Sequence, residues 1–510
     1  MPSHSSSTEP TFVAGPHDAA NSGEGRGADA GAVAGVNHGE NHVASANETP
    51  QSTELSRRSW LATSVGLGGM SLAGFLHAQA ASEAAGATGG ANRRMFPGGR
   101  AKSCIILYCW GGMSHIDCWD LKPDAPIEIR GEFQPIETAT PGILIGEHLP
   151  RMARHTDKLA IVRSIFHDDS AHGRGMYWNL TGHKPPRVGN IPPMKNDWPS
   201  LPAMVSHFRA SPPGVPRSVR LPYPLVDNNT LQAGEYGGWL GTKYDPIVMR
   251  PPGGEPYGGV SQTLGSEVLH LGEVDLGRVT ERKQLRASLE NPIGSERDFE
   301  DFQHFRGLAQ EILLGSAVKN AYQLDREDPR VREMYGDHLG GQSLLLARRL
   351  TEAGVPIVQV CCAAGDLNGG AGDMWDTHSD NFNRLKNRLL PVFDRSASAL
   401  LQDLHDRGTL DETLVVVLTD FGRTPRVNGS AGRDHYPSVY SVAFAGGGIR
   451  GGQVYGSSDS LAAYPRDLPC GPPDVHATIF HALGISPRAE LRDPLGRPMP
   501  VSDGQVLPLG

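Results

Sequence analysis

The feature that most constrains the fold is a repeated alternation of amphipathic helical segments with short apolar segments. Residues Gly341–Ala353 place apolar side chains at the helical period, Gly354 interrupts them, and the apolar run Val355–Val360 follows. Because parallel strands are joined through helices that cover both faces of the sheet, this pattern predicts an α/β fold with a mostly parallel sheet. Further strands are predicted at Ser103–Cys109, Leu159–Ile165, Glu412–Leu418 and Ser441–Phe444, and further helices at Glu147–His155, Asn381–Arg407 and Asp474–Leu483.

The amino-terminal part of the chain has a different character. Residues 1–56 are rich in Ser, Gly, Ala and Asn and poor in large apolar side chains, so we expect a disordered leader. Arg57 and Arg58 then precede an uncharged segment that ends in an Ala-Gln-Ala sequence. This order resembles a twin-arginine signal peptide over residues 57–80, followed by a linker over 81–100. It predicts export by the twin-arginine machinery to the periplasm or cell surface, and a buried core helix is the alternative.

Residues 101–510 are predicted to form one large domain. The helix–strand pattern is lost between residues 184 and 292, where Pro and Gly are frequent, so we expect an irregular insertion over the functional site. A net charge of −9 argues against a broad basic surface, and we expect no nucleic-acid partner. No apolar run reaches the roughly 20 residues that span a bilayer, so no transmembrane span is expected in the mature protein.

Acidic and imidazole side chains follow almost every predicted core strand. In an open parallel sheet, ligands bind beyond the carboxyl ends of the strands, and these ends meet at one edge. We therefore expect the side chains of these segments to converge. The segments are WGGMSHID (110–117), FHDDSAH (166–172), WDTH (375–378), TDFGRTP (419–425) and GRDHYP (432–437).

Imidazoles and carboxylates in such a set indicate a metal site. Together they suit zinc, iron or manganese, whereas oxygen ligands alone suit calcium or magnesium. Asp376 and His378 are two residues apart, so in an extended segment their side chains project to one side. Arg423 and Arg433 suit bidentate binding of a sulfate or phosphate oxyanion. The structural alternatives are a cap for Asp117 and Asp420, an ion pair for Asp434, Arg423 and Arg433, and a turn or packed loop position for His172 and His435.

Several blocks between about residues 101 and 510 resemble the DUF1501 family, among them GGMSHIDCWDLKPDAP, YWNLTGH, LLARRLTEAGVPIVQV, TDFGRTP, GRDHYP and FAGGGIRGGQVYGSSD. That family is similar to the alkaline-phosphatase-like superfamily, which includes sulfatases, phosphatases and phosphodiesterases. The resemblance implies a three-layer α/β/α sandwich and a hydrolase site that holds a divalent metal such as zinc, calcium or manganese. By position, it implies that the metal ligands are Asp117, Asp376, His378, Asp420 and His435.

The resemblance leaves two candidate catalytic residues at the nucleophile position. Alkaline phosphatases carry the nucleophile in Asp-Ser-Ala, which this chain has at 169–171, and this motif assigns Ser170. Counting back from Thr181-Gly182, as in the same enzymes, assigns His172 instead. A metal-bound alkoxide is a competent nucleophile, so Ser170 is preferred in that role and His172 is preferred as a ligand.

Three functions follow from these observations. The preferred one is an exported metal-dependent hydrolase that acts on a sulfate or phosphate ester, with an anionic ester or a sulfated glycan as substrate. The second is a catalytically degenerate protein that binds a metal or an anionic glycan without turnover. Phe421 favours it, since superfamily enzymes often have His there, and so does the absence of the sulfatase sequence C-x-P-S-R. The third is a structural protein in which these residues only hold loops.

Overall fold

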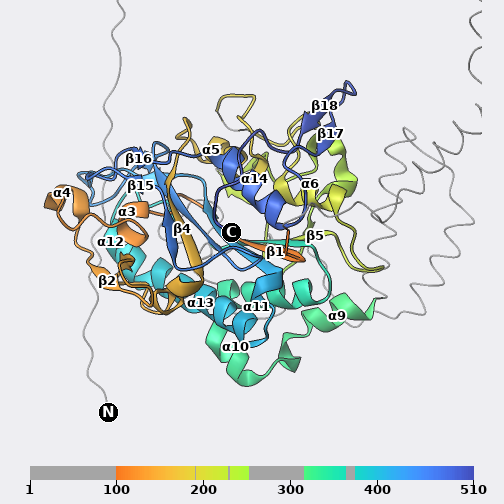
Figure 1. The fold of residues 1–510 in the computed structure, drawn as a ribbon, viewed down its shortest axis with the longest axis horizontal. Helices are drawn as coiled ribbons and strands as arrows, with labels where there is room; N and C mark the ends of the chain where they lie inside the picture. The colour runs from red at the N-terminus through yellow and green to blue at the C-terminus, as the bar shows by residue number, and fades with distance from the viewer. Residues whose placement is uncertain (1–98, 190, 228–229, 252–314, 363–373) are drawn as a thin grey trace, which may run out of the picture. The chain divides into compact units, whose positions relative to one another are not determined.

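A central sheet of eight strands runs through the molecule (Figure 1). The computed structural model describes residues 99–189, 191–227, 230–251, 315–362 and 374–510. The expected leader and signal peptide, the expected linker up to residue 98, and residues 252–292 of the expected insertion lie outside the described residues. In spatial order the strands are β14 (Gln453–Tyr455), β4 (Leu159–Ile165), β13 (Tyr440–Ala445), β10 (Thr413–Thr419), β1 (Ser103–Cys109), β9 (Ile357–Cys361), β5 (Ser218–Leu221) and β8 (Ile247–Val248).

The sheet is mostly parallel, as the sequence predicts. β1 lies at its centre and pairs in parallel with both β9 and β10, so that Ile106 is opposite Gln359 on one side and Val416 on the other. β5 pairs in parallel with β9 and with β8. β13 is antiparallel to both of its neighbours, β10 and β4, which leaves β4 parallel to β1. The carboxyl ends of β1, β4, β9 and β10 therefore point to the same edge.

Helices cover both faces of the sheet and bury its alternating side chains, which gives the three-layer arrangement (Figure 1). On β1, Ile105 and Leu107 face one apolar core, while Ile106 and Tyr108 face the other. One layer contains α9 (Ser316–Tyr322), α10 (Pro329–Tyr335), α11 (Leu339–Glu352) and α13 (Leu390–Asp406), and the other contains α5 (His172–Thr181), α6 (Leu201–Phe208) and α14 (Pro472–Ala482). The remaining helices are α3 (His115–Cys118), α4 (Ile127–Arg130) and α12 (Asn381–Arg384).

Two predicted helices differ from the structure. The segment Glu147–His155 was expected to be α-helical, but the chain forms a 3-10 helix at Met152–Lys158 instead. Pro150 lacks an N–H donor, and Asp394 of α13 accepts the backbone N–H groups of Arg151 and Met152, so tertiary contacts set where this helix begins. The predicted helix Asn381–Arg407 is divided, because a π-helical segment, Leu385–Leu389, joins α12 to α13.

Short strands and turns complete the fold. Residues 184–251, which were expected to be irregular, supply α6 and the two sheet strands β5 and β8. The two-stranded sheets are β2 (Pro135–Glu137) with β3 (Leu144–Gly146), β6 (Val226–Asp227) with β7 (Thr230–Leu231), β11 (Gly422–Arg423) with β12 (His435–Tyr436), β15 (Ser457–Ser458) with β16 (Pro465–Asp467), and β17 (Glu490–Arg492) with β18 (Pro498–Pro500). Short 3-10 turns lie at Gly238–Leu240, Thr242–Tyr244, Leu324–Arg326 and Leu410–Glu412.

A buried ion network on the α11 side predicts acid-sensitive stability. Arg348 and Arg349 each lie 2.6 Å from Glu327 Oε2, and Arg407 lies 2.9 Å from Oε1. Burial alone would raise the pKa of Glu327, but these arginines lower it to about 2. A lowered folded-state pKa stabilises the protein above the unfolded-state pKa of about 4.3, and this contribution disappears as the pH falls towards 2.

We therefore expect Glu327→Gln to lower the free energy of unfolding by about 1–2 kcal/mol at pH 7, after allowance for solvent screening. Near pH 2 the variant and the wild type should be equally stable. Urea unfolding at several pH values measures the difference, with exposed Glu490→Gln as the control. A difference that does not change with pH would refute this account of the network.

Candidate metal centre

Loops at the carboxyl edge of the sheet bring together side chains that are far apart in the sequence. His172 is the first residue of α5, which follows β4, and Asp376 lies in the segment after β9. His435 comes from β12, which pairs with β11 just beyond β10. Gly111 follows β1 with a φ of +109°, and a Cβ there would lie 2.6 Å from the backbone nitrogen of Asp376. Glycine at 111 therefore lets the Asp376 segment approach β1.

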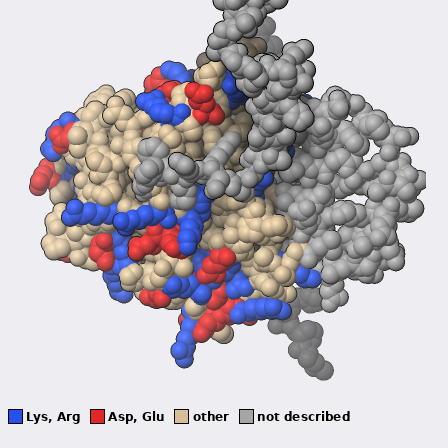
Figure 2. Space-filling model, turned by 45° about the vertical axis from the view of Figure 1, so that its right-hand side comes forward, with Lys and Arg blue, Asp and Glu red and all other residues tan. Residues whose placement is uncertain are grey.

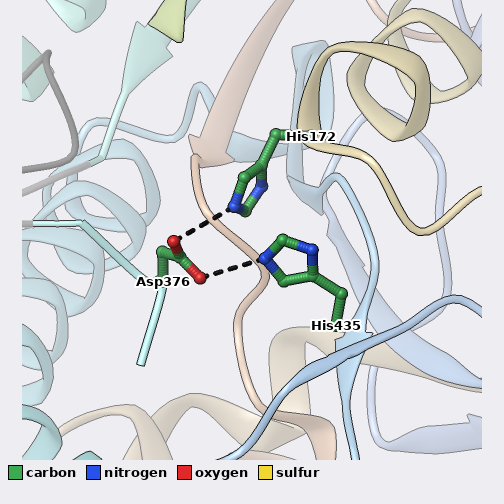
Figure 3. Close-up of side chains that lie close together, drawn as sticks. All are labelled: His172, Asp376 and His435. Atoms are coloured by element: carbon green, nitrogen blue, oxygen red, sulfur yellow. Dashed lines mark hydrogen bonds and ion pairs between the residues drawn. The ribbon is translucent and has the colours of Figure 1, made fainter. Parts of the chain in front are cut away.

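Three of these side chains form a compact cluster (Figure 3). His172, Asp376 and His435 each offer one ligand atom, and these atoms lie within 4.8 Å of one another. Nε2 of His172 is 3.3 Å from Oδ2 of Asp376, and Nε2 of His435 is 3.1 Å from Oδ1 of the same carboxylate. Two imidazoles thus point at the two oxygens of one carboxylate (Figure 3).

Hydrogen bonds on the far side of each ring fix Nε2 as the nitrogen that faces Asp376. His172 Nδ1 is 2.5 Å from Oδ2 of Asp420, and His435 Nδ1 is 2.7 Å from the backbone oxygen of Ser170. Both partners are acceptors, so each Nδ1 carries the proton, and Nε2 of a neutral ring carries a lone pair. The buried Nε2 of His172 contacts no acceptor other than Asp376 among the described residues. Lone pairs that face a carboxylate repel it unless a proton or a cation lies between them.

A third imidazole has the same arrangement. His378 Nδ1 lies 2.7 Å from Oδ1 of Asp434, so this ring also directs Nε2 inward. That nitrogen is 2.9 Å from Nε2 of His435 and 3.2 Å from Oδ1 of Asp376. His378 is more exposed than the other two rings, with 46% of its side chain accessible. It can supply a further ligand from the solvent side.

Asp420 and Arg423 hold the cluster in place from behind. Asp420 is fully buried, and its Oδ1 accepts the backbone N–H of Gly111 at 3.1 Å. Because its Oδ2 contacts Nδ1 of His172, we infer that Asp420 orients this ring, a role that carboxylates often have beside metal-binding histidines. The buried Arg423 donates to Oδ1 of Asp376 at 2.6 Å and to the carbonyls of Gly111 and Gly112. Each of its three nitrogens donates to an acceptor of the protein, so the structure gives Arg423 a supporting position.

The ionisation of the cluster follows from these contacts. Burial alone would lower the pKa of His172, but the carboxylates of Asp376 and Asp420 raise it to about 9. Burial would raise the pKa of Asp376, yet His172, His435 and Arg423 hold it well below its usual range. Burial lowers the pKa of His435, which is consistent with a neutral ring. Metal binding at this cluster would therefore release a proton from His172.

Two predicted site residues lie outside the cluster. Asp117 was expected to bind the metal and Arg433 the substrate, but the two side chains form a fully buried bidentate pair at 2.8 and 2.9 Å. Asp117 also accepts hydrogen bonds from Ser114 and Asn381, at 2.5 and 3.0 Å. The structure therefore supports the ion-pair alternative for Arg433, with Asp117 instead of Asp434 as its partner.

Ser170 and Phe421 lie at the border of the cluster. The side chain of Ser170 is exposed, and its backbone oxygen is held by His435. The ring of Phe421 packs 5.0 Å from the ring of His172 and 4.6 Å from that of His435, measured between ring centroids. Phe421 thus closes the inner side of the cluster with an apolar surface.

Sequence reasoning missed Asp227, the last residue of β6. Burial raises its pKa, and the charges of His172, Asp420, Asp376 and His435 also act on it, so this carboxylate lies in the electrostatic field of the cluster. Its hairpin packs on the first turn of α5, since a Cβ on Gly173 would lie 2.1 Å from Oε1 of Gln232. Strand β5 precedes Asp227, but the sequence did not predict this strand, so the pattern of residues after predicted strands could not reveal Asp227.

The fold and the cluster define an α/β protein with a candidate metal centre at the carboxyl edge of its sheet. Its family is identified by a match over residues 101–508: the chain belongs to the family described as "Protein of unknown function (DUF1501)". No curated protein matches the chain. Among the described residues, no helix is both long and apolar enough to cross a membrane.

Three solved structures illustrate the proteins to which the fold is similar. A phosphonate monoester hydrolase from Silicibacter pomeroyi is 13% identical, with a TM-score of 0.31 over 80% of this chain and 76% of that chain. A sulfatase from Pseudoalteromonas sp. is 13% identical, with a TM-score of 0.32 over 75% and 68%. A protein in the alkaline phosphatase superfamily from Vibrio parahaemolyticus is 10% identical, with a TM-score of 0.33 over 78% and 71%.

Proposed function

We propose that this chain is an exported, metal-dependent hydrolase of sulfate or phosphate esters. One observation carries the proposal: the Nε2 atoms of His172, His378 and His435 converge on the carboxylate of Asp376, and each Nδ1 is held by an acceptor. A divalent cation would lie between these nitrogens and the carboxylate, in place of the proton on Nε2 of His172. The export part rests on the paired arginines and the signal-like segment of the sequence.

The donor set favours some metals over others. Three imidazole nitrogens with one carboxylate suit zinc or manganese, while calcium prefers a shell of oxygen ligands. We propose that Asp376, His172 and His435 hold the ion and that His378 completes the set. When bound, such an ion would supply Lewis-acid polarisation of the ester oxygen and charge neutralisation.

The remaining chemistry belongs to side chains of the chain itself. We propose that Ser170 is the nucleophile: its oxygen bonds to sulfur or phosphorus, the bond to the alcohol oxygen breaks, and the alcohol leaves with the hydroxyl proton. Water then releases sulfate or phosphate and restores the serine hydroxyl. The hydrogen bond from His435 to the Ser170 carbonyl fixes this residue beside the cluster. Phe421 excludes water from the inner side of the cluster.

The test is turnover of 4-nitrophenyl sulfate and 4-nitrophenyl phosphate by the zinc- or manganese-loaded protein. We expect hydrolysis that requires the metal, and we expect Ser170→Ala to lower kcat by about 10³-fold while leaving the metal content unchanged. Exposed Ser460→Ala is the matched control and should retain wild-type kcat. A Ser170→Ala variant with wild-type kcat would exclude Ser170 as the nucleophile.

One observation favours a second candidate, a protein that binds the metal or an anionic glycan without turnover. Phe421 packs against two of the proposed ligands, at a position where an imidazole would add a donor. The same experiment decides between the two functions. A protein that binds stoichiometric metal but hydrolyses neither ester would overturn the hydrolase proposal and support the second candidate.

A further inference from the structure

A basic pocket lies away from the metal centre, between the 3-10 helix Met152–Lys158 and helix α13. Its volume is about 240 Å³, and its lining contains Arg151, Arg154, Lys158 and Arg395 but no acidic side chain. The whole chain carries a net charge of −9, so four cations around one small pocket are unusual for this protein. The 3-10 helix lies at the amino end of β4, and the metal centre lies at the carboxyl end of the same strand. The pocket and the metal centre are therefore separated by the length of β4, about 20 Å.

The cations of the pocket are poorly neutralised. Arg151 and Arg154 are exposed, and within the described parts of the chain neither guanidinium forms an ion pair with a carboxylate, although the charges of both act on Asp394. Arg395 donates to the backbone oxygens of Glu333 and Met334, which leaves its positive charge without an acidic partner in the same residues. Lys158 pairs only with the adjacent Asp157, at 2.9 Å. Figure 2 shows one face of the molecule, on which a band of Lys and Arg has Asp and Glu beside it.

A buried imidazole adds a second observation. His155 lines the same pocket and is 9% exposed, and its Nδ1 is buried without a hydrogen-bond partner among the described residues. An adjoining pocket has a volume of about 510 Å³. Arg151 and Arg395 line both pockets. Glu147 and Asp394 line the adjoining pocket, so an anionic group fits the first pocket, whose lining has no acidic side chain.

We propose that this pocket binds sulfate or phosphate groups of an anionic glycan, at a site separate from the metal centre. A membrane surface is less suitable, because the apolar lining consists of Met334 and Ala399, which are not among the large exposed hydrophobic residues. Peripheral membrane binding needs apolar side chains that can enter the lipid. The proposal does not depend on hydrolytic activity.

Calorimetric titration with dextran sulfate, a sulfated glucan, tests the proposal, with uncharged dextran as the reference ligand. We expect the wild type to bind dextran sulfate but not dextran, and Arg151→Gln/Arg154→Gln to weaken binding by about tenfold or more. The control Arg450→Gln/Arg488→Gln removes the same charge from two other exposed positions and should bind like the wild type. Unchanged thermal unfolding and metal content show that each variant is folded.

Two outcomes would overturn the proposal. Equal weakening in both double variants would mean that overall charge, and not this pocket, controls binding. Binding of phosphatidylglycerol vesicles without binding of dextran sulfate would assign the pocket to a membrane surface.

Discussion

Replacing Asp376 with Asn is expected to weaken binding of zinc or manganese by about 100-fold or more, so that the dialysed protein retains no stoichiometric metal. The carboxylate of Asp376 is the only negative group that faces the Nε2 atoms of both His172 and His435 in the described cluster. Asparagine keeps the shape and an oxygen acceptor for Arg423, so the fold should persist. Elemental analysis and competition with a chromophoric chelator measure the loss.

The matched control for this variant is Asp325→Asn, which changes an exposed carboxylate on the short turn before α10. It should retain the metal content and affinity of the wild type. Ester hydrolysis, where present, should fall in Asp376→Asn by roughly the fraction of metal that is lost. An Asp376→Asn protein that keeps wild-type metal affinity would show that Asp376 is not a ligand.

The second large effect concerns the buried pair Asp117–Arg433. We expect Arg433→Met to lower the free energy of unfolding by about 3–5 kcal/mol, because it leaves the carboxylate of Asp117 buried without its partner. Asp117→Asn should lower the free energy of unfolding by a comparable amount, because it leaves the guanidinium of Arg433 buried without its partner. The double variant should lose less free energy of unfolding than the sum of the losses in the two single variants, since neither charge then remains buried without a partner. Denaturant unfolding of the four proteins measures this coupling.

The same variants separate a structural role from a metal-binding role for Asp117. In our account, folded Asp117→Asn keeps its metal, because Asp117 contacts Ser114, Asn381 and Arg433 and lies outside the cluster. If Asp117→Asn instead lost the metal while it remained folded and as stable as the wild type, Asp117 would belong to the ligand set.

The sequence predicted the core of the fold well where local pattern and burial agree. The predicted bounds of β1 and β4 are those of the structure, because both are largely apolar runs that begin directly after a lysine, Lys102 or Lys158. β5 and β8 were not recognised, since each is short and lies in a Pro-rich segment where pairing with the sheet overrides weak local preference. The 3-10 helix Met152–Lys158 likewise depends on Asp394, more than 200 residues away.

The candidate site could be predicted only in outline. The rule that functional side chains follow parallel strands selected His172, Asp376, His378 and His435, which the structure does bring together. The rule carries no information on which charged groups pair in space, so it placed Asp117 and Arg433 among the site residues, although they neutralise each other. It also could not indicate the direction of each imidazole, which depends on acceptors such as Asp420 and the Ser170 carbonyl.

X-ray absorption spectroscopy of the zinc-loaded protein tests the central claim most directly, because it reports the atoms bound to the ion. The account predicts at least two imidazole nitrogens at about 2.0–2.1 Å from the metal. It also predicts the loss of one of them in His435→Ala. A coordination shell made of oxygen atoms alone, unchanged in His435→Ala, would contradict the convergence of these histidines on a shared metal ion.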